Sequence, residues 1–169
     1  MRNKFIQKIH GECFLVCLAN WFDDDWFIRS HNADLSKGIS LLQGKRIVDF
    51  YSEGEIRLTT ILLSRTPIDT YLPFFEDPAD FSGELKDYED YYLPFFVTIP
   101  SDGHGHEILV IKELYNKGVT VLDPYFKEGK KMGAKKFFET YKPLQIETLC
   151  NTNNEQSLFS SKHVAHLMN

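Results

Sequence analysis

Apolar residues recur at helical spacing near the start of the chain and at strand spacing in its second half. Between Cys13 and Phe22 they recur every three or four positions, which predicts a helix. The run Asp23-Asp24-Asp25 would place acidic side chains at the negative end of the helix dipole, so the helix is expected to end there. Residues 134–141 predict a second helix with a face of aromatic residues, namely Phe137, Phe138 and Tyr141.

The second half of the chain contains the patterns typical of strands. Short apolar runs rich in β-branched residues occupy Phe95–Ile99, Ile108–Lys112 and Val119–Leu122. Between the last two runs, Tyr115-Asn116-Lys117-Gly118 predicts a hairpin turn, with glycine where a positive φ is needed. Residues 126–133 are charged and predict a loop. A helix early and an antiparallel sheet late together predict an α+β domain.

The middle and the end of the chain are less regular. Ser52-Glu-Gly-Glu55 has the pattern of a capping box, which predicts a helix running on to Ser64. Residues 76–90 are acidic and are either a solvated loop or a rim that attracts a basic peptide. After Thr148 the sequence turns polar. We therefore divide the chain into a domain over residues 1–148 and a tail over residues 149–169, which is either disordered or forms one weak helix.

Composition excludes several classes of protein. The chain has 169 residues, a hydrophobic fraction of 43% and a net charge of −5. This length suits one domain with a core, and the negative charge argues against nucleic acid as a partner. No apolar run approaches the roughly 18 residues that span a bilayer. The N-terminus has charges but no apolar signal core after them, so we expect a soluble cytoplasmic protein. Secretion of an effector without a cleavable signal stays open.

The cysteines do not suggest a disulfide framework, because there are only three of them: Cys13, Cys17 and Cys150. Cys13 and Cys17 could in principle bind zinc together with His104 and His106. The simpler alternative for cysteines on an apolar helix is buried packing, and we expect it for Cys17. We expect neither a metal nor a cofactor.

Three reactive residue types occur at the ends of the predicted elements. Cys13 begins a helix, where the dipole favours a thiolate. His106 precedes one hairpin strand and Asp123 follows its partner, so the hairpin places both at its open end. A histidine oriented by an aspartate can shuttle the proton of the thiol. Gln7 could donate to the oxyanion formed on attack. His104 is a rival base, but His106 adjoins the strand and is held more rigidly.

These residues resemble one family of cysteine peptidases. Gln7, then Glu12-Cys13-x-x-x-Cys17-Leu18-Ala19, then His106 before an aliphatic strand and Asp123-Pro124 are similar to the bacteriocin-processing peptidases that cleave double-glycine leaders. The resemblance covers roughly residues 5–142. It implies a papain-like fold, in which the helix carrying the cysteine packs on the antiparallel sheet. It also implies that Cys13 is the nucleophile, His106 the base, Asp123 the orienting acid and Gln7 the oxyanion donor.

One residue departs from the family pattern. Phe14 follows the cysteine where the family usually has glycine, and this bulky residue could alter the mouth of the site. No transporter segment follows, so we expect a stand-alone cysteine peptidase with a peptide or protein substrate. Phe14 motivates the alternative of a peptidase-like binding module that does not cleave. A third hypothesis is an amidase or deamidase that uses the same triad.

Overall fold

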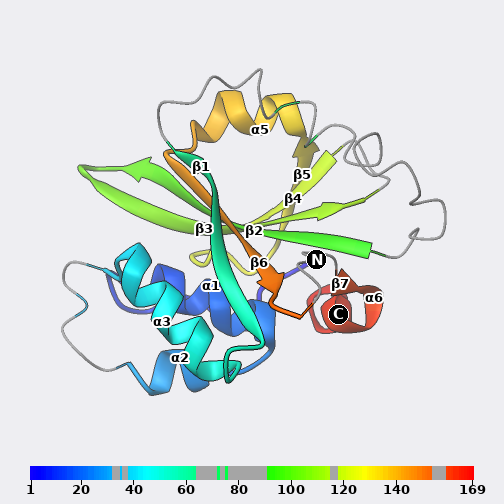
Figure 1. Cartoon of the computed structure of the whole chain (residues 1–169). Helices are drawn as coiled ribbons and strands as arrows, with labels where there is room; N and C mark the ends of the chain where they lie inside the picture. The colour runs from blue at the N-terminus through cyan, green and yellow to red at the C-terminus, as the bar shows by residue number, and fades with distance from the viewer. Residues whose placement is uncertain are drawn as a thin grey trace.

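Helices cover both faces of one antiparallel sheet in the computed structural model, which describes residues 1–31, 35, 38–63, 72, 75, 91–114, 118–153 and 159–169. The helices of these residues are α1 (Cys13–Phe22), α2 (Trp26–Arg29), α3 (Leu41–Tyr51), α5 (Ala134–Tyr141) and α6 (Ser161–Met168). Helices α1, α2 and α3 lie on one side of the sheet and α5 lies on the other (Figure 1). This arrangement confirms the predicted α+β class.

The sheet joins strands from distant parts of the chain. The described strands are β1 (Ile56–Leu63), β2 (Tyr91–Ser101), β3 (His104–Glu113), β4 (Gly118–Leu122), β5 (Lys130–Gly133), β6 (Gln145–Asn151) and β7 (Phe159–Ser160). Their order is β1-β6-β2-β3-β4-β5, and β7 pairs with the start of β2. The predicted pairing of β3 with β4 is confirmed, with Leu109 opposite Leu122. The turn predicted at residues 115–117 lies outside the described residues.

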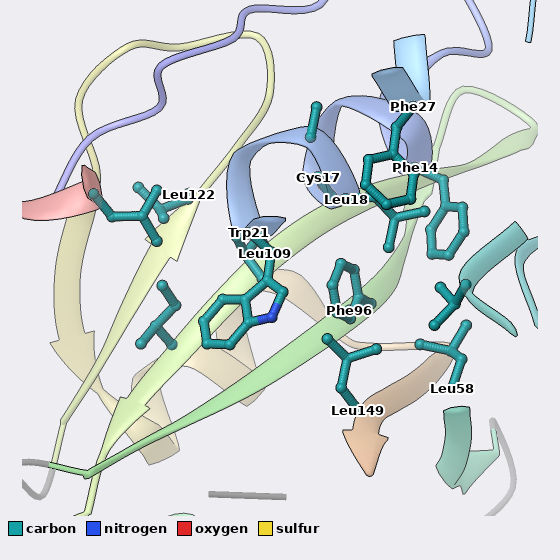
Figure 2. Packing of buried hydrophobic residues seen from close by; sticks show 14 of the residues in the cluster. Phe14, Cys17, Leu18, Trp21, Phe27, Leu58, Phe96, Leu109, Leu122 and Leu149 are labelled. Carbon is teal, nitrogen blue, oxygen red and sulfur yellow. The ribbon is translucent and has the colours of Figure 1, made fainter. Parts of the chain in front are cut away.

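Alternate residues of the central strands enter two separate cores, because successive side chains of a strand point to opposite faces. Phe96 of β2 and Leu109 of β3 belong to the core on the α1 side, which Figure 2 shows. Phe95 and Val110 belong to the core under α5. Burial of a large apolar side chain contributes about 1.5–3 kcal/mol, so the two cores hold the sheet rigidly between the helix layers.

Helix α1 is buried on nearly all sides, as expected for a helix without a polar face. Every residue from Phe14 to Trp21 is buried. The helix ends where the acidic run begins, and Asp23 takes the left-handed conformation with φ of 55°. The predicted bounds of this helix are therefore confirmed, and so are those of α5.

The helix predicted from Ser52 to Ser64 is wrong, because this segment contains a turn followed by β1. The capping box lies instead at Ser40: its Oγ accepts from the backbone N–H of Gln43, and its own backbone N–H donates to the Gln43 side chain at the start of α3. Glu53 and Gly54 then take positive φ values and turn the chain. β1 pairs along its length with β6, and these backbone hydrogen bonds outweigh the local helical pattern.

Two further segments are more ordered than their polar sequences indicate. Residues 130–133, predicted as part of a loop, form β5 because they pair with β4 and set Met132 against the core. The boundary proposed at residue 148 falls inside β6, and α6 buries Val164 and Leu167 beside α1. Residues 159–169 of the expected tail thus belong to the same core as the rest of the chain.

Two further sequence predictions concern the acidic stretch and the absence of membrane spans. The acidic stretch at residues 76–90 lies outside the described residues. None of the helices in the described ranges is long and apolar enough to cross a membrane.

Candidate active site

Cys13 is the first residue of α1, and the end of that helix directs its N–H groups and positive partial charge toward the thiol. The side chain is half-buried. Its Sγ accepts a hydrogen bond of 3.4 Å from the backbone N–H of Glu107, which lies on the neighbouring strand β3. Both the helix end and this donor place positive partial charge beside the sulfur.

The β3–β4 hairpin brings His106 and Asp123 together at its open end. His106 lies in β3, and Asp123 is the first residue after β4. The Nε2 atom of His106 lies 3.0 Å from Oδ1 of Asp123. Their side chains are 10% and 22% exposed, so the pair is largely shielded from water. The β3–β4 register sets Leu109 opposite Leu122, so His106 and Asp123 meet diagonally across the open end of the hairpin, the end at which the sequence predicts both.

The imidazole of His106 carries its proton over a wide pH range. Burial lowers the pKa of His106, but hydrogen bonds to Asp123 and to Cys13, together with the charges of both partners, raise it to about 9 overall. Because Nε2 faces Asp123, Nδ1 is the nitrogen left for the hydrogen bond with Cys13. The ring therefore lies between thiol and carboxylate, in contact with each.

Gln7 reaches the same site from the N-terminal segment. Its backbone N–H donates to the carbonyl of Pro124 at 2.8 Å, which ties this segment to the turn after Asp123. Its side-chain Nε2 donates to the carbonyl of Ile9 at 3.0 Å and to the hydroxyl of Tyr125 at 3.3 Å. The predicted oxyanion donor is thus at the site, but both hydrogens of its amide already have acceptors.

Glu12, the acidic residue before the cysteine, has a structural role. Its carboxylate Oε2 accepts a hydrogen bond of 2.6 Å from the backbone N–H of Ile9, and the side chain is buried. This bond fixes the loop between Gln7 and Cys13. A buried carboxylate with a backbone donor is well satisfied, so Glu12 positions the loop on which Gln7 lies.

Phe14 points into the core, although its edge also lines the cavity beside Cys13. It packs edge-on against Phe96 with ring centroids 5.8 Å apart. A Cβ atom built on Gly44 would lie 2.5 Å from Phe14 Cε1, so α3 approaches the ring closely through that glycine. Phe14 therefore fills the space between α1 and α3 and also lines the cavity, so an effect of this residue on the mouth of the site stays a prediction.

We expect Phe14→Ala to lower the free energy of unfolding by about 3–5 kcal/mol, because it leaves a cavity among α1, α3 and β2. Urea unfolding followed by circular dichroism measures this loss. Leu42→Ala is the matched control, since Leu42 is 59% exposed on α3 and its truncation should change stability by less than about 0.5 kcal/mol. A loss below about 1 kcal/mol for Phe14→Ala would contradict this structural role.

Cys17 and His104 are not part of the series of contacts that joins Cys13, His106 and Asp123. Cys17 is 1% exposed, and burial raises its pKa well above the usual value, which is the packed cysteine that the sequence predicts. His104 is exposed and lies edge-on to His10, with ring centroids 5.7 Å apart. Within the described ranges, no group of three or more His, Cys, Asp or Glu side chains could hold a metal. The zinc alternative therefore has no support there.

A cavity of about 370 Å³ opens above the thiol. Cys13 and His106 line it together with Gln7, Tyr125, His104 and Asp102. Ligand sites commonly have volumes of about 300–1,000 Å³, so the cavity can hold one or two residues of a peptide or a small acyl group.

Sequence reasoning missed two residues of the site, Glu107 and Tyr125. Glu107 is buried, and its Oε2 accepts a hydrogen bond of 2.8 Å from Thr98. Burial and the charge of nearby Glu147 raise the pKa of Glu107 well above its usual value, and the backbone N–H of the same residue is the donor to Cys13 Sγ. Its signal in the sequence is a glutamate directly before the apolar run Ile108–Ile111. Tyr125 directly follows the Asp123-Pro124 pair and stacks on His106.

Neither a family model nor a curated protein sequence matches this chain. The resemblance to the leader peptidases therefore depends on the few residues quoted from the sequence and not on similarity along the chain.

Proposed function

We propose that this protein is a papain-like cysteine peptidase that cleaves an amide bond through Cys13, His106 and Asp123. The observation that carries the proposal is the unbroken series of contacts from thiol to imidazole to carboxylate at the edge of a cavity. The order of these residues and the Gln7 amide beside them support the resemblance to the bacteriocin-processing peptidases. The substrate is a peptide or a segment of a protein that places one or two residues in the cavity.

The reaction begins from the pair in which His106 holds the proton given up by the Cys13 thiol, and Asp123 stabilises this imidazolium. The sulfur then attacks the carbonyl carbon, and the carbonyl π electrons move to the oxygen to form a tetrahedral oxyanion. As the C–N bond breaks, the imidazolium donates its proton to the leaving amine, and an acyl-Cys13 thioester remains.

Water completes the cycle. His106 accepts a proton from the water that attacks the thioester, and the acid product leaves as the Cys13 sulfur takes its bonding electrons back. The largely shielded His106–Asp123 hydrogen bond keeps the ring in the orientation that both steps need.

At neutral pH, iodoacetamide is expected to alkylate Cys13 at least about tenfold faster than Cys150 or Cys17, because only Cys13 combines a helix N-terminus, a backbone donor and an adjacent imidazole. Quenched time points followed by peptide mass spectrometry give the rate at each cysteine. His106→Ala should bring the Cys13 rate toward that of Cys150. Equal rates for Cys13 and Cys150 in the wild-type protein would reject an activated thiol.

Incubation with a diverse peptide library then identifies the reaction. Paired fragments whose masses sum to the parent peptide plus water support a peptidase. Products that have only exchanged a side-chain amide for a carboxyl indicate a deamidase. Retention of peptides on the protein without any product indicates a binding module, and it would contradict the proposed activity.

A further inference from the structure

Tyr125 contacts three residues of the candidate site, namely His106, Asp123 and Gln7. Its ring stacks on the ring of His106, with centroids 5.0 Å apart and an interplanar angle of 22°. Its backbone N–H donates to Oδ1 of Asp123 at 3.0 Å. Its hydroxyl accepts the hydrogen bond from Gln7 Nε2. The side chain is 51% exposed and lines the cavity above the thiol, so its hydroxyl is open to a bound substrate.

The hydrogen bonds of Gln7 limit what its amide can offer. A side-chain amide has two N–H hydrogens, and here one goes to the Ile9 carbonyl and the other to Tyr125. Turning the amide over would place its oxygen against the Ile9 carbonyl oxygen, so this contact fixes its orientation. Gln7 is only 7% exposed, which restricts its movement further. Its amide therefore has no free hydrogen to give to an oxyanion.

The Tyr125 hydroxyl has a hydrogen that it can still donate, which the Gln7 amide lacks. A phenolic hydroxyl accepts hydrogen bonds through its oxygen and donates one through its hydrogen. The oxygen accepts from Gln7, and no acceptor for the hydrogen occurs among the described residues. An N–H donated to the phenolic oxygen also polarises the O–H bond and makes it a better donor.

The geometry points to Tyr125 as the oxyanion donor, with Gln7 as the positioning residue that orients its hydroxyl. This inference rests on the proposed function and assigns a different role to Gln7. In the tetrahedral intermediate, the hydroxyl hydrogen of Tyr125 binds the negative oxygen, while Gln7 keeps its bond to the phenolic oxygen. The ring of Tyr125 stays on His106, so the hydroxyl and the stacked ring are separable parts of one side chain.

Two reagents separate donation to the oxyanion from activation of the thiol. p-Nitrophenyl acetate is attacked at a carbonyl carbon: the Cys13 sulfur bonds to that carbon, an oxyanion forms, and p-nitrophenolate then leaves. Iodoacetamide is attacked at a saturated carbon: the sulfur displaces iodide and no oxyanion forms. The ratio of the two rates at Cys13 therefore reports the oxyanion donor, and a change in thiolate content alone would move both rates together.

We expect Tyr125→Phe to slow acetylation of Cys13 roughly 10- to 100-fold and to leave its alkylation within about twofold, because only the hydroxyl is removed. Gln7→Ala should likewise slow the acetylation of Cys13 and leave its alkylation unchanged. The double variant should be little slower than either single one, since the two residues act as a unit. Tyr51→Phe is the matched control: it also removes a hydroxyl that forms a hydrogen bond, here to Asp24, and should change neither rate.

The outcomes distinguish this inference from the proposed function. Suppose that Cys13 is acetylated in the Tyr125→Phe variant as fast as in the wild type or faster, while its acetylation in Gln7→Ala is slow. This result would show that Gln7 donates directly to the oxyanion and that Tyr125 only covers the site. Equal losses in acetylation and alkylation would assign Tyr125 a structural role only. No acetylation of Cys13 in the wild-type protein would overturn the peptidase proposal and this inference with it.

Discussion

Cys13→Ala is expected to abolish both acetylation by p-nitrophenyl acetate and cleavage of library peptides, with a loss of about four orders of magnitude or more. The reason is chemical, since no other group that contacts His106 can form the thioester. Release of p-nitrophenolate followed at 400 nm and product masses measure the loss. The variant should remain folded, because Cys13 is half-buried at the start of α1 and leaves the core residues of that helix in place.

Cys17→Ala is the matched control for this variant. Cys17 lies one turn further along the same helix, and its Sγ donates to the carbonyl of Glu107 at 3.6 Å. Removing this buried thiol should lower stability by about 1 kcal/mol and leave the rates at Cys13 within a few-fold. If Cys13→Ala kept a substantial part of the activity, or if Cys17→Ala lost as much, the assignment of the nucleophile would be wrong.

The rate of acylation by peptide substrates is expected to fall above about pH 9, because the leaving amine needs the proton of the His106 imidazolium and the pKa of His106 is about 9. The Asp123 carboxylate raises this pKa through a hydrogen bond and its charge, whereas burial lowers it. Asp123→Ala removes the contribution of Asp123, leaves that of Cys13, and keeps most of the burial. The alkaline limb of the pH–rate profile, where the rate falls as the pH rises, should therefore move to lower pH. The rate at neutral pH should fall about 100-fold or more.

Rates of peptide cleavage between pH 5 and pH 10.5 test this prediction. Asp102→Asn is the matched control, because it removes one carboxylate from the rim of the same cavity without contacting His106. Asp102 has a positive φ of 34°, a conformation that asparagine also tolerates. The limb should stay near pH 9 in this control. A limb that does not move in Asp123→Ala would mean that His106 is not the acid of the reaction.

The sequence predicts those parts of the fold that depend on local pattern. Helix α1 is found within its bounds because its apolar residues recur at helical spacing up to the acidic run. The pairing of His106 with Asp123 is found because a hairpin turn fixes which strand ends meet. Neither inference needs information from the rest of the chain.

β1 could not be found in this way. Ser52-x-x-Glu55 and Ser40-x-x-Gln43 both fit the capping-box pattern, yet only the second starts a helix. What separates them is the partner strand β6, which lies far along the chain and offers a ladder of backbone hydrogen bonds to β1. The same limit applies to α6, because its short apolar pattern becomes decisive only when Val164 and Leu167 meet α1.

The candidate site shows the same division. Cys13, His106, Asp123 and Gln7 are each marked by residue type and position. In the structure Cys13, His106 and Gln7 line one cavity, and Asp123 is hydrogen-bonded to His106. The sequence does not show which acceptors the two N–H hydrogens of the Gln7 amide bind, because this depends on the positions of the Ile9 carbonyl and the Tyr125 hydroxyl in the fold. Whether a buried N–H has an acceptor is decided by the folded structure and not by the residue type.

The wide separation of Cys13 and Glu107 along the chain also sets how late in synthesis the candidate site can form. The thiol is made early, but the backbone donor beside it and the imidazole follow about ninety residues later, which takes roughly 5–20 s of synthesis. Asn3 then has to find the carbonyls of Asp123 and Phe126, and Arg2 that of Leu167. Under the proposed function, a nascent chain therefore lacks the complete Cys13–His106 pair until β3 has been made and has paired beside α1.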